Sequence, residues 1–387
     1  MTRLLDFAVA LRQSRALLAR EREPFSAFQQ QRFDTLVEHA RRRSPFYRDW
    51  DGAPLDKATM MEHFDAIVTD PRLRRDERYL GDYRVMTTSG SSGLKGLFVY
   101  DRAGWTGIMA QFLRYSATVG IEPRFPRRLR IGAVVSPTGT HMSRRCASAV
   151  DVGVHRVLGL AVTQPLREIV SRLNAFQPQS LNTFPTMALE LAEEQRAGRL
   201  RIAPELISTS SELLTPEMAD RIEETWCVRP YSLYATTEGL WGVDCEHHAG
   251  IHLFEDMVRV ENVDEHGRAV PDGAPGAKLL VPNLFNFVQP LLRLEIADAV
   301  TIAAEPCACG RTLRRLESVA GRAHDVLELG DVRVQPLHFG VIARDRDVVE
   351  FQVVQTGPSS VRVLVVARGD VQARLRERCS NGCAGWA

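Results

Sequence analysis

The middle of the chain alternates short apolar runs with segments of helical period, and this alternation constrains the fold more than any other feature. The predicted strands end in polar residues and the predicted helices lie between them: strands at 128–136, 204–212 and 230–239, and helices at 186–198 and 215–226. Strands that alternate with helices of this length predict a mostly parallel sheet covered on both faces. Ligands of such sheets gather at the carboxyl ends of the strands.

The chain is long for a single compact core, because it has 387 residues. Two helices are predicted near its start, at 1–23 and 25–47, and the texture becomes rich in β-strands after about residue 250. A hairpin is predicted at 351–368. We therefore expect an α/β fold with two or more structural units.

Charge and cysteine content exclude several classes of protein. The net charge is +1, whereas neutralising a phosphate backbone takes a surplus of basic residues, so a nucleic-acid partner is not expected. The sequence shows neither an apolar run long enough to span a membrane nor the cleavage site of a secretory signal, so a cytoplasmic protein without a membrane partner is expected. Seven cysteines without regular spacing do not suggest a disulfide framework.

A polar, flexible run at 87–96 lies between a charged segment and a predicted strand. Residues 87–96 contain two threonines, three serines and three glycines. Such a run exposes backbone N–H groups and hydroxyls, which suits binding a polyphosphate, although the strict G-x-x-x-x-G-K-[ST] loop is absent. Taken alone, the run is weak evidence for a phosphate site, because a serine- and glycine-rich turn is more often a plain connecting loop.

Five short stretches resemble, in order, the motifs of adenylate-forming enzymes, the acyl-CoA synthetase and ligase superfamily. They are TSGSSGLKG (88–96) for the phosphate loop, SSE (210–212) for the adenine segment, YATTE (234–238) for Tyr-Gly-x-Thr-Glu, RLEIAD (293–298) for Arg-Tyr-x-Thr-Gly-Asp, and GRAHD (321–325) for the hinge. The N-terminal helices, SPFYRDW (44–50) and CACGRTL (307–313) are similar to phenylacetate-CoA ligase-like proteins, especially those related to the synthetases that adenylylate a deazaflavin cofactor. The resemblance covers residues 25–365.

The resemblance implies a large adenylate-forming domain of mixed and parallel sheets with a β-rich subdomain at 1–320, including N-terminal helices at 1–50. A small α+β C-terminal domain would follow at 321–387, shortened relative to the family. The activity implied is ATP-dependent activation of a small, aromatic or other, carboxylic acid as an acyl-adenylate. The acyl group would then pass to coenzyme A or an amine, and a homodimer is a candidate assembly.

The phosphates of ATP would be met by donors and by Mg²⁺, a cation that prefers carboxylate and phosphate oxygens. The implied loop residues are Thr88, Ser89, Gly90, Ser91, Ser92 and Gly93, with Lys95 as a cation at the loop's end. Thr237 would touch the α-phosphate and Glu238 would hold Mg²⁺. Arg322, in the hinge motif, would approach the phosphates.

The nucleoside and the acid would be bound by the remaining motifs. Adenine is assigned to Ser210, Ser211, Glu212, Tyr234, Ala235 and Thr236, and the ribose hydroxyls to Asp298. A buried core position is the alternative for Tyr234, and a surface turn is the alternative for Asp298. Ser136, Phe184 and Pro185 follow predicted strands where the family lines its acyl pocket, although core packing explains Phe184 equally well.

A second site is indicated by CEHHAGIH (245–252) and CACG (307–310), which together offer three cysteines and three histidines. A structural zinc ion needs four N/S ligands, and two ligands close in sequence commonly supply half of them. The related ligases carry a similar element. We expect Zn²⁺ on Cys245, His248, Cys307 and Cys309, with His252 as the alternative to His248; buried free thiols are the competing interpretation.

The sequence departs from the family at three places. Leu-Lys-Gly replaces the usual Pro-Lys-Gly around Lys95, and Ala235 stands where glycine is usual. The family's C-terminal domain delivers a lysine to the reacting centre, but no lysine follows Lys278 here. Either an arginine or another protein substitutes, or the chain is a nucleotide-binding homologue with reduced catalysis and a regulatory or structural role.

Overall fold

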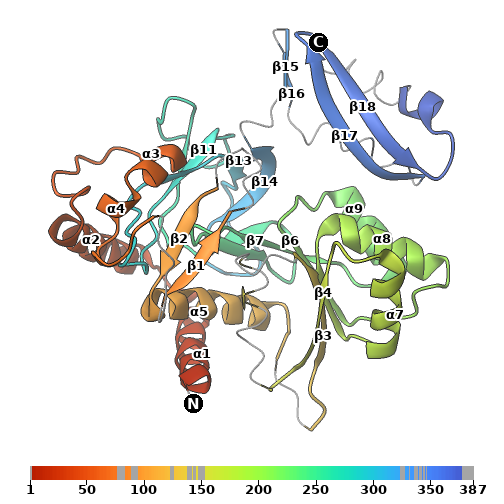
Figure 1. The fold of residues 1–387 in the computed structure, drawn as a ribbon, viewed down its shortest axis with the longest axis horizontal. Coiled ribbons are helices and arrows are strands. Elements are labelled where there is room, and N and C mark those ends of the chain that lie inside the picture. The colour runs from red at the N-terminus through yellow and green to blue at the C-terminus, as the bar shows by residue number, and fades with distance from the viewer. Residues whose placement is uncertain are drawn as a thin grey trace.

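A nine-stranded mixed sheet forms the backbone of the computed structural model, with strand order β13-β14-β9-β8-β7-β6-β5-β3-β4. The structure describes residues 2–75, 83–88, 95–122, 126–136, 142, 145–146, 153–322, 327–330, 332–334, 339, 342, 345 and 347–376. Figure 1 shows the sheet between two groups of helices. The α/β architecture expected from the alternating pattern is confirmed.

The parallel half of the sheet is built from the alternating segments of the sequence. Its strands are β3 (Arg130–Val135), β4 (Arg156–Ala161), β5 (Ser180–Thr183), β6 (Leu206–Ser210) and β7 (Tyr231–Ala235). Three helices with buried apolar stripes pack on one face: α7 (Leu166–Phe176), α8 (Pro185–Arg196) and α9 (Pro216–Trp226). Thr215 caps α9 by accepting the N–H of Met218 at 3.3 Å, as its sequence predicts.

The opposite face of the sheet is covered by α5 (Arg102–Thr118), whose buried residues pack on Trp241 and Val243. Helix α1 (Thr2–Arg20) lies along α5, and α2 (Ser26–Arg43) packs against the same core. The short helices α3 (Lys57–Glu62) and α4 (Phe64–Ile67) follow. The sheet is therefore covered on both faces, with N-terminal helices on one side and α7–α9 on the other.

The chain after β7 becomes antiparallel, as the β-rich texture predicts. The remaining strands of the large sheet are β8 (Trp241–Asp244), β9 (Ile251–Leu253), β13 (Asp298–Ile302) and β14 (Arg315–Arg322). A smaller sheet contains β10 (Glu261–Val263), β11 (Lys278–Val281) and β12 (Leu294–Ile296). Their apolar side chains share a third core with β9, β13 and β14.

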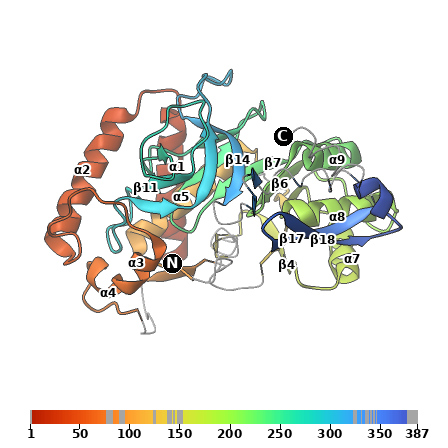
Figure 2. The same ribbon diagram turned by 90° about the horizontal axis from the view of Figure 1, so that it is seen from above.

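Two hairpins follow β14. Strands β15 (Leu327–Leu329) and β16 (Val332–Val334) form the first, and β17 (Val348–Gly357) and β18 (Ser360–Ala367) form the second, at the predicted position. Figure 2, the view from above, draws β17 and β18 in front of α8, and Arg368 donates to the Glu193 carboxylate of α8 at 3.0 Å. The boundary expected at residue 321 coincides with the last two residues of β14, Gly321 and Arg322.

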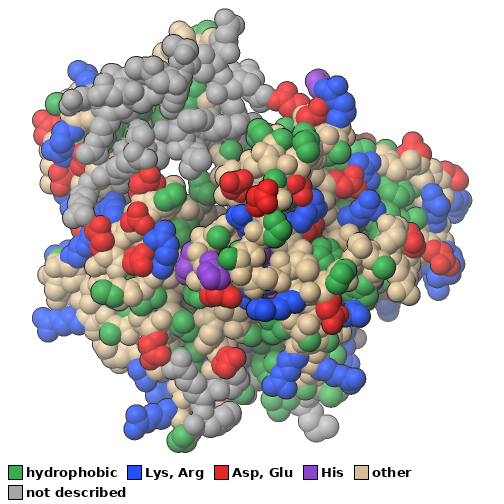
Figure 3. All heavy atoms as spheres, turned by 180° about the vertical axis from the view of Figure 1, so that it is seen from behind, with side chains coloured by type: hydrophobic (Ala, Val, Ile, Leu, Met, Phe, Trp, Pro, Cys, Tyr) green, Lys and Arg blue, Asp and Glu red, His purple; other side chains and the backbone are tan. Residues whose placement is uncertain are grey.

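Basic and acidic side chains are interspersed on the face shown in Figure 3, without a field of a single sign. This distribution agrees with the net charge of +1. None of the described helices is long and apolar enough to cross a membrane.

Candidate active site and metal centre

Four segments named from the sequence meet at one edge of the sheet, because they follow four neighbouring parallel strands. Ser136 comes directly after β3, Phe184 after β5, Ser211 after β6 and Thr236 after β7. The carboxyl ends of parallel strands lie at the same edge, which is where ligands of such sheets bind. The topology thus brings the adenine, acyl and YATTE segments together.

The glycine-rich run is the turn of a hairpin. Strand β1 (Arg84–Thr87) pairs with β2 (Leu97–Tyr100), and at the turn's base the N–H of Thr88 donates to the Gly96 carbonyl at 3.1 Å. The Thr88 hydroxyl accepts the N–H of Gly96 at 2.8 Å. Lys95 is exposed. The other loop residues assigned from the sequence, Ser89, Gly90, Ser91, Ser92 and Gly93, lie outside the described residues.

The YATTE segment ends β7 and turns sharply. Thr236 closes the turn, since its N–H donates to the Leu240 carbonyl at 2.9 Å and its carbonyl accepts the N–H of Gly239 at 3.2 Å. Gly239 has φ +105°, and a Cβ there would lie 2.3 Å from Asn283 Nδ2, so only glycine fits. Ala235 belongs to β7 and is not among the described residues with positive φ, which explains how alanine replaces glycine there.

Thr237 and Glu238 are held by groups from distant segments. The Tyr100 hydroxyl at the end of β2 donates to the Thr237 carbonyl at 2.7 Å, and Asn283 Nδ2 donates to the Glu238 carbonyl at 2.8 Å. Burial, followed by the nearby Glu238 charge, raises the pKa of Tyr100 well above its usual value, so the phenol stays a donor. These bonds fix the turn beside the hairpin base.

Glu238 is buried, with 8% of its surface exposed, and Lys57 approaches its carboxylate. The Lys57 Nζ atom lies 3.6 Å from Glu238 Oε1. A buried carboxylate can bind a hard metal ion such as Mg²⁺ through its oxygens.

Tyr234 and Asp298 come together although 64 residues separate them. The Tyr234 hydroxyl donates to Asp298 Oδ2 at 2.5 Å, although Asp298 starts β13, which β14, β9 and β8 separate from β7 in the sheet. Asp298 is paired in register with Arg322 of β14, so the hinge motif meets the RLEIAD motif through the backbone; the Arg322 side chain lies outside the described residues. Arg293 instead serves structure, since it donates to Glu261 at 2.8 Å.

The residues assigned to adenine at 210–212, and Phe184 and Pro185 assigned to the acyl pocket, also make contacts within the fold. Ser210 ends β6, and Ser211 adopts φ 70°, which is uncommon for a residue other than glycine. The Glu212 carboxylate accepts the Thr186 hydroxyl at 2.8 Å in the first turn of α8. Phe184 packs partly buried against the core under α7–α9, and Pro185 starts α8.

Sequence reasoning missed three residues of this site: Lys57, Tyr100 and Asn283. Lys57 carried a signal, because it is one of only three lysines among 49 basic residues. Tyr100 ends the apolar run after the glycine-rich loop, but nothing in the sequence links it to Thr237. Asn283 follows β11 and had no local signal.

A metal-ligating cluster is formed by Cys245, His252, Cys307 and Cys309, whose ligand atoms all lie within 4.8 Å of one another. Cys245 Sγ is 3.7 Å from Cys307 Sγ, and Cys309 Sγ is 3.4 Å from His252 Nε2. A tetrahedron with Zn–S bonds of about 2.3 Å has edges of about 3.8 Å, so these separations fit zinc.

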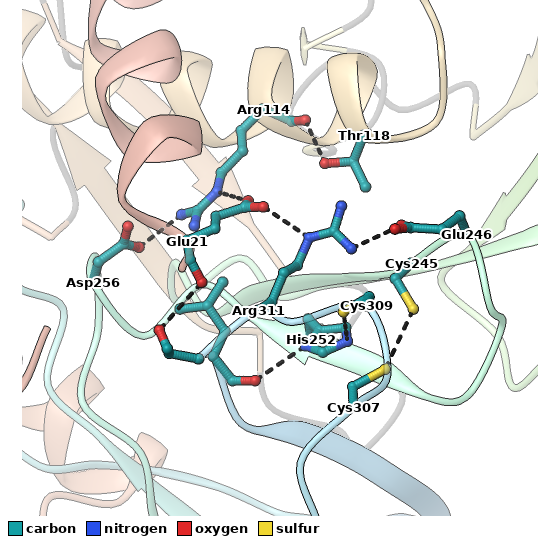
Figure 4. Close-up of polar contacts among 12 residues, drawn as sticks. Glu21, Arg114, Thr118, Cys245, Glu246, His252, Asp256, Cys307, Cys309 and Arg311 are labelled. Carbon is teal, nitrogen blue, oxygen red and sulfur yellow. Dashed lines mark hydrogen bonds and ion pairs between the residues drawn. The ribbon is translucent and has the colours of Figure 1, made fainter. Parts of the chain in front are cut away.

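The structure places His252, not His248, in the cluster. His248 has φ 48° in the turn after β8, and its ring packs 4.5 Å from that of Tyr231. His252 lies in β9 opposite Arg315 of β14, which follows the CACG segment. This pairing turns the His252 ring toward the cysteines, as Figure 4 shows.

Metal binding at the cluster requires a neutral histidine and thiolates, so the pKa values of its groups bear on it in different directions. His252 Nδ1 lies 3.0 Å from the Leu313 carbonyl, which fixes the proton on Nδ1 and leaves Nε2 as a ligand atom, and burial lowers the pKa of His252. Burial raises the pKa of Cys245 to about 11. At Cys307 burial also acts upward, but hydrogen bonds from Cys309 and Cys245 hold its pKa below the usual value.

No family model matches the chain. The phenylacetate-coenzyme A ligase of Thermus thermophilus is 27% identical over 343 residues, which cover 81% of this chain and 74% of that protein. The phenylacetate-coenzyme A ligase of Escherichia coli is 23% identical over 354 residues, 85% of this chain and 77% of that protein.

Solved structures show the same fold. A 2-hydroxyisobutyryl-CoA ligase in the postadenylation state, in complex with R3-HIB-AMP, has a TM-score of 0.76, 20% identity, and covers 94% of this chain and 86% of its own. The amide bond synthetase McbA of Marinactinospora thermotolerans has a TM-score of 0.52 at 16% identity, covering 77% of this chain and 62% of its own. At these identities the likeness concerns the fold alone. By sequence this chain is thus similar to phenylacetate-coenzyme A ligases over most of its length, and its fold is that of adenylate-forming ligases.

Proposed function

We propose that this protein is an ATP-dependent ligase that activates a small carboxylic acid as an acyl-adenylate. The observation that carries the proposal is the edge of the sheet where β3, β5, β6 and β7 end. Glu238 and the Tyr234–Asp298 pair follow from the end of β7, and the β1–β2 hairpin contacts the same turn through Tyr100. This arrangement occurs in a chain similar to phenylacetate-CoA ligases over most of its length. Aromatic acids are the first candidates for substrate.

Activation requires charge on the phosphates to be met as pyrophosphate leaves. Thr88 and the loop beyond it would donate to the phosphates, and Thr237 would touch the α-phosphate. Glu238 would hold Mg²⁺, which supplies positive charge to the phosphate oxygens. The Tyr100 and Asn283 hydrogen bonds keep the turn that carries Thr237 and Glu238 in one position.

The nucleoside would lie between Tyr234 and the end of β6. Asp298 would accept the ribose hydroxyls, a role that suits a carboxylate with two acceptor oxygens. The Tyr234 hydroxyl orients that carboxylate through the 2.5 Å hydrogen bond. Ser136 and Phe184 would face the acid from the ends of β3 and β5.

The acyl group would pass from the adenylate to coenzyme A or to an amine. Both acceptors occur among proteins with this fold, since the similar structures include a CoA ligase and an amide bond synthetase. We further propose that a cytoplasmic location suits the chain, because the described cysteines are all free thiols. A homodimer and a domain boundary at residue 321 stay predictions.

We also propose a structural zinc ion on Cys245, His252, Cys307 and Cys309. The separations fit a closed tetrahedral site, whose zinc supplies folding free energy by joining the β8–β9 turn to the segment before β14. Three thiolates with Zn²⁺ carry one net negative charge. Figure 4 shows Arg311 beside the cluster, where it is paired with Glu21 and Glu246.

ATP–pyrophosphate exchange with a panel of aryl and short aliphatic acids tests the proposed function. Exchange that depends on one class of acid is expected, and product analysis with coenzyme A or amines then assigns the acceptor. Tight ATP binding without exchange for any acid would refute the ligase and favour the catalytically reduced homologue.

A further inference from the structure

Lys57 occupies a defined position at the start of α3. Asp56 caps this helix by accepting the N–H of Thr59 at 2.7 Å. The preceding Leu55 is paired with β12: its N–H donates to the Arg293 carbonyl, and its carbonyl accepts the N–H of Glu295, both at 2.9 Å. The Lys57 backbone is therefore anchored to the segment that leads to Asp298.

The Lys57 side chain extends from this anchor to the β1–β2 hairpin, whose turn is the glycine-rich run. A Cβ added at Gly96 would lie 3.4 Å from Lys57 Cδ, so the lysine stem runs along the hairpin's base, where Gly96 is bonded to Thr88. Its ammonium ends 3.6 Å from Glu238 Oε1. Lys57 thus bridges the two elements to which the phosphates and the metal ion are assigned.

The pairing with Glu238 is suited to exchange of partners. The Lys57 side chain is 29% exposed and that of Glu238 is 10% exposed, so the ammonium keeps access to solvent and ligand while the carboxylate is largely buried. At 3.6 Å the contact is an ion pair longer than a charge-assisted hydrogen bond. A metal ion on Glu238 would compete with the ammonium, which would then need another anionic partner.

Resting on the proposed function, we propose that Lys57 is a phosphate-binding catalytic residue supplied by the N-terminal part of the chain. Its ammonium pairs with Glu238 in the free protein and donates to triphosphate oxygens when magnesium nucleotide binds. In the reaction a carboxylate oxygen of the acid forms a bond to the α-phosphorus. The bond from that phosphorus to pyrophosphate breaks, and pyrophosphate leaves with the electron pair. Lys57 offsets the negative charge on the phosphate oxygens throughout.

The alternative role is purely structural, with the ion pair only holding α3 against the turn after β7. The chain offers a matched control in Lys278, which is 23% exposed and pairs with Glu295 at 2.6 Å. Lys57→Gln and Lys278→Gln each remove one partly exposed lysine from one carboxylate. A structural role predicts similar losses of melting temperature and nothing else.

The decisive measurement is binding of ATP with Mg²⁺ by calorimetry, without any acid. For Lys57→Gln we expect affinity to fall by about 10- to 100-fold, the range for charge-assisted hydrogen bonds. Adenosine affinity should stay unchanged, because the lost contact is to phosphate. Lys57→Arg should recover part of the ATP affinity, and Lys278→Gln should bind ATP as the unmodified protein does.

Exchange of pyrophosphate into ATP separates the two proposals. With an active acid, Lys57→Gln should lose more than about tenfold of its exchange rate at saturating nucleotide. If the unmodified protein binds ATP but exchanges with no acid, the ligase function fails while the binding data still decide the role of Lys57. Unchanged ATP affinity in Lys57→Gln, or absence of ATP binding by the unmodified protein, would overturn the phosphate role.

Discussion

Arg114 should be among the most important side chains for stability, because it carries a buried charge between two buried carboxylates. Its side chain is fully buried in α5, with Nε 2.7 Å from Glu21 Oε1 and Nη1 2.7 Å from Asp256 Oδ1. The guanidinium also lies 4.3 Å over the ring of Phe254. Figure 4 shows this network continuing through Glu21 to Arg311, which donates to Glu21 Oε2 at 2.8 Å.

The substitution Arg114→Met keeps much of the side-chain volume but leaves Asp256 without its hydrogen-bonding cation. Removing one partner of a buried ion pair typically costs about 3–5 kcal/mol. Loss of a desolvated cation–π contact adds up to about 2 kcal/mol. Glu21 still has Arg311, and methionine restores apolar contacts, so we expect the free energy of unfolding to fall by about 4 kcal/mol.

Urea unfolding followed by tryptophan fluorescence measures this loss. Arg42→Met is the matched control, because Arg42 pairs with Glu38 on the exposed face of α2 at 3.2 Å and should lose less than about 0.5 kcal/mol. Asp256→Asn combined with Arg114→Met should cost less than the sum of the single variants, since the uncompensated carboxylate is gone. A loss under about 1 kcal/mol for Arg114→Met, or strict additivity in the double variant, would refute the reasoning.

Three further substitutions test the two sites. Glu238→Gln should abolish pyrophosphate exchange while the melting temperature changes little; exchange at the normal rate would remove its metal role. Asp298→Ala should weaken ATP binding by roughly 1.5–3 kcal/mol in calorimetry, and unchanged affinity would count against the ribose contact. Purified protein should contain about one zinc per chain by elemental analysis, and Cys307→Ser should lose the metal and unfold at lower temperature. A zinc-free preparation that melts as high as the zinc-loaded one would end the zinc proposal.

The sequence by itself determined the elements and their order. Period and turn chemistry are local properties, so the strands β3, β6 and β7 and the helices α8 and α9 could be placed from their own residues, and Thr215 marked the start of α9. Because parallel strands end at one edge, the same reasoning grouped the segments after them without any knowledge of distances. The five motifs gave the family and hence the expected roles.

Only the tertiary structure decided which distant side chains meet. Lys57 reaches Glu238 because Leu55 pairs with β12, and Tyr234 reaches Asp298 although three strands separate β7 from β13 in the sheet. Neither contact leaves a signature in local spacing.

The metal cluster and the buried charges show the same dependence on long-range packing. The sequence favoured His248 with His252 as the alternative, whereas the antiparallel pairing of β9 with β14 places His252 in the cluster. The packing of α1 on α5 encloses Arg114 with Glu21, which lies 93 residues away in the sequence. Burial is a property of the whole fold, so the contribution of these groups to the free energy of unfolding could not be predicted from the sequence.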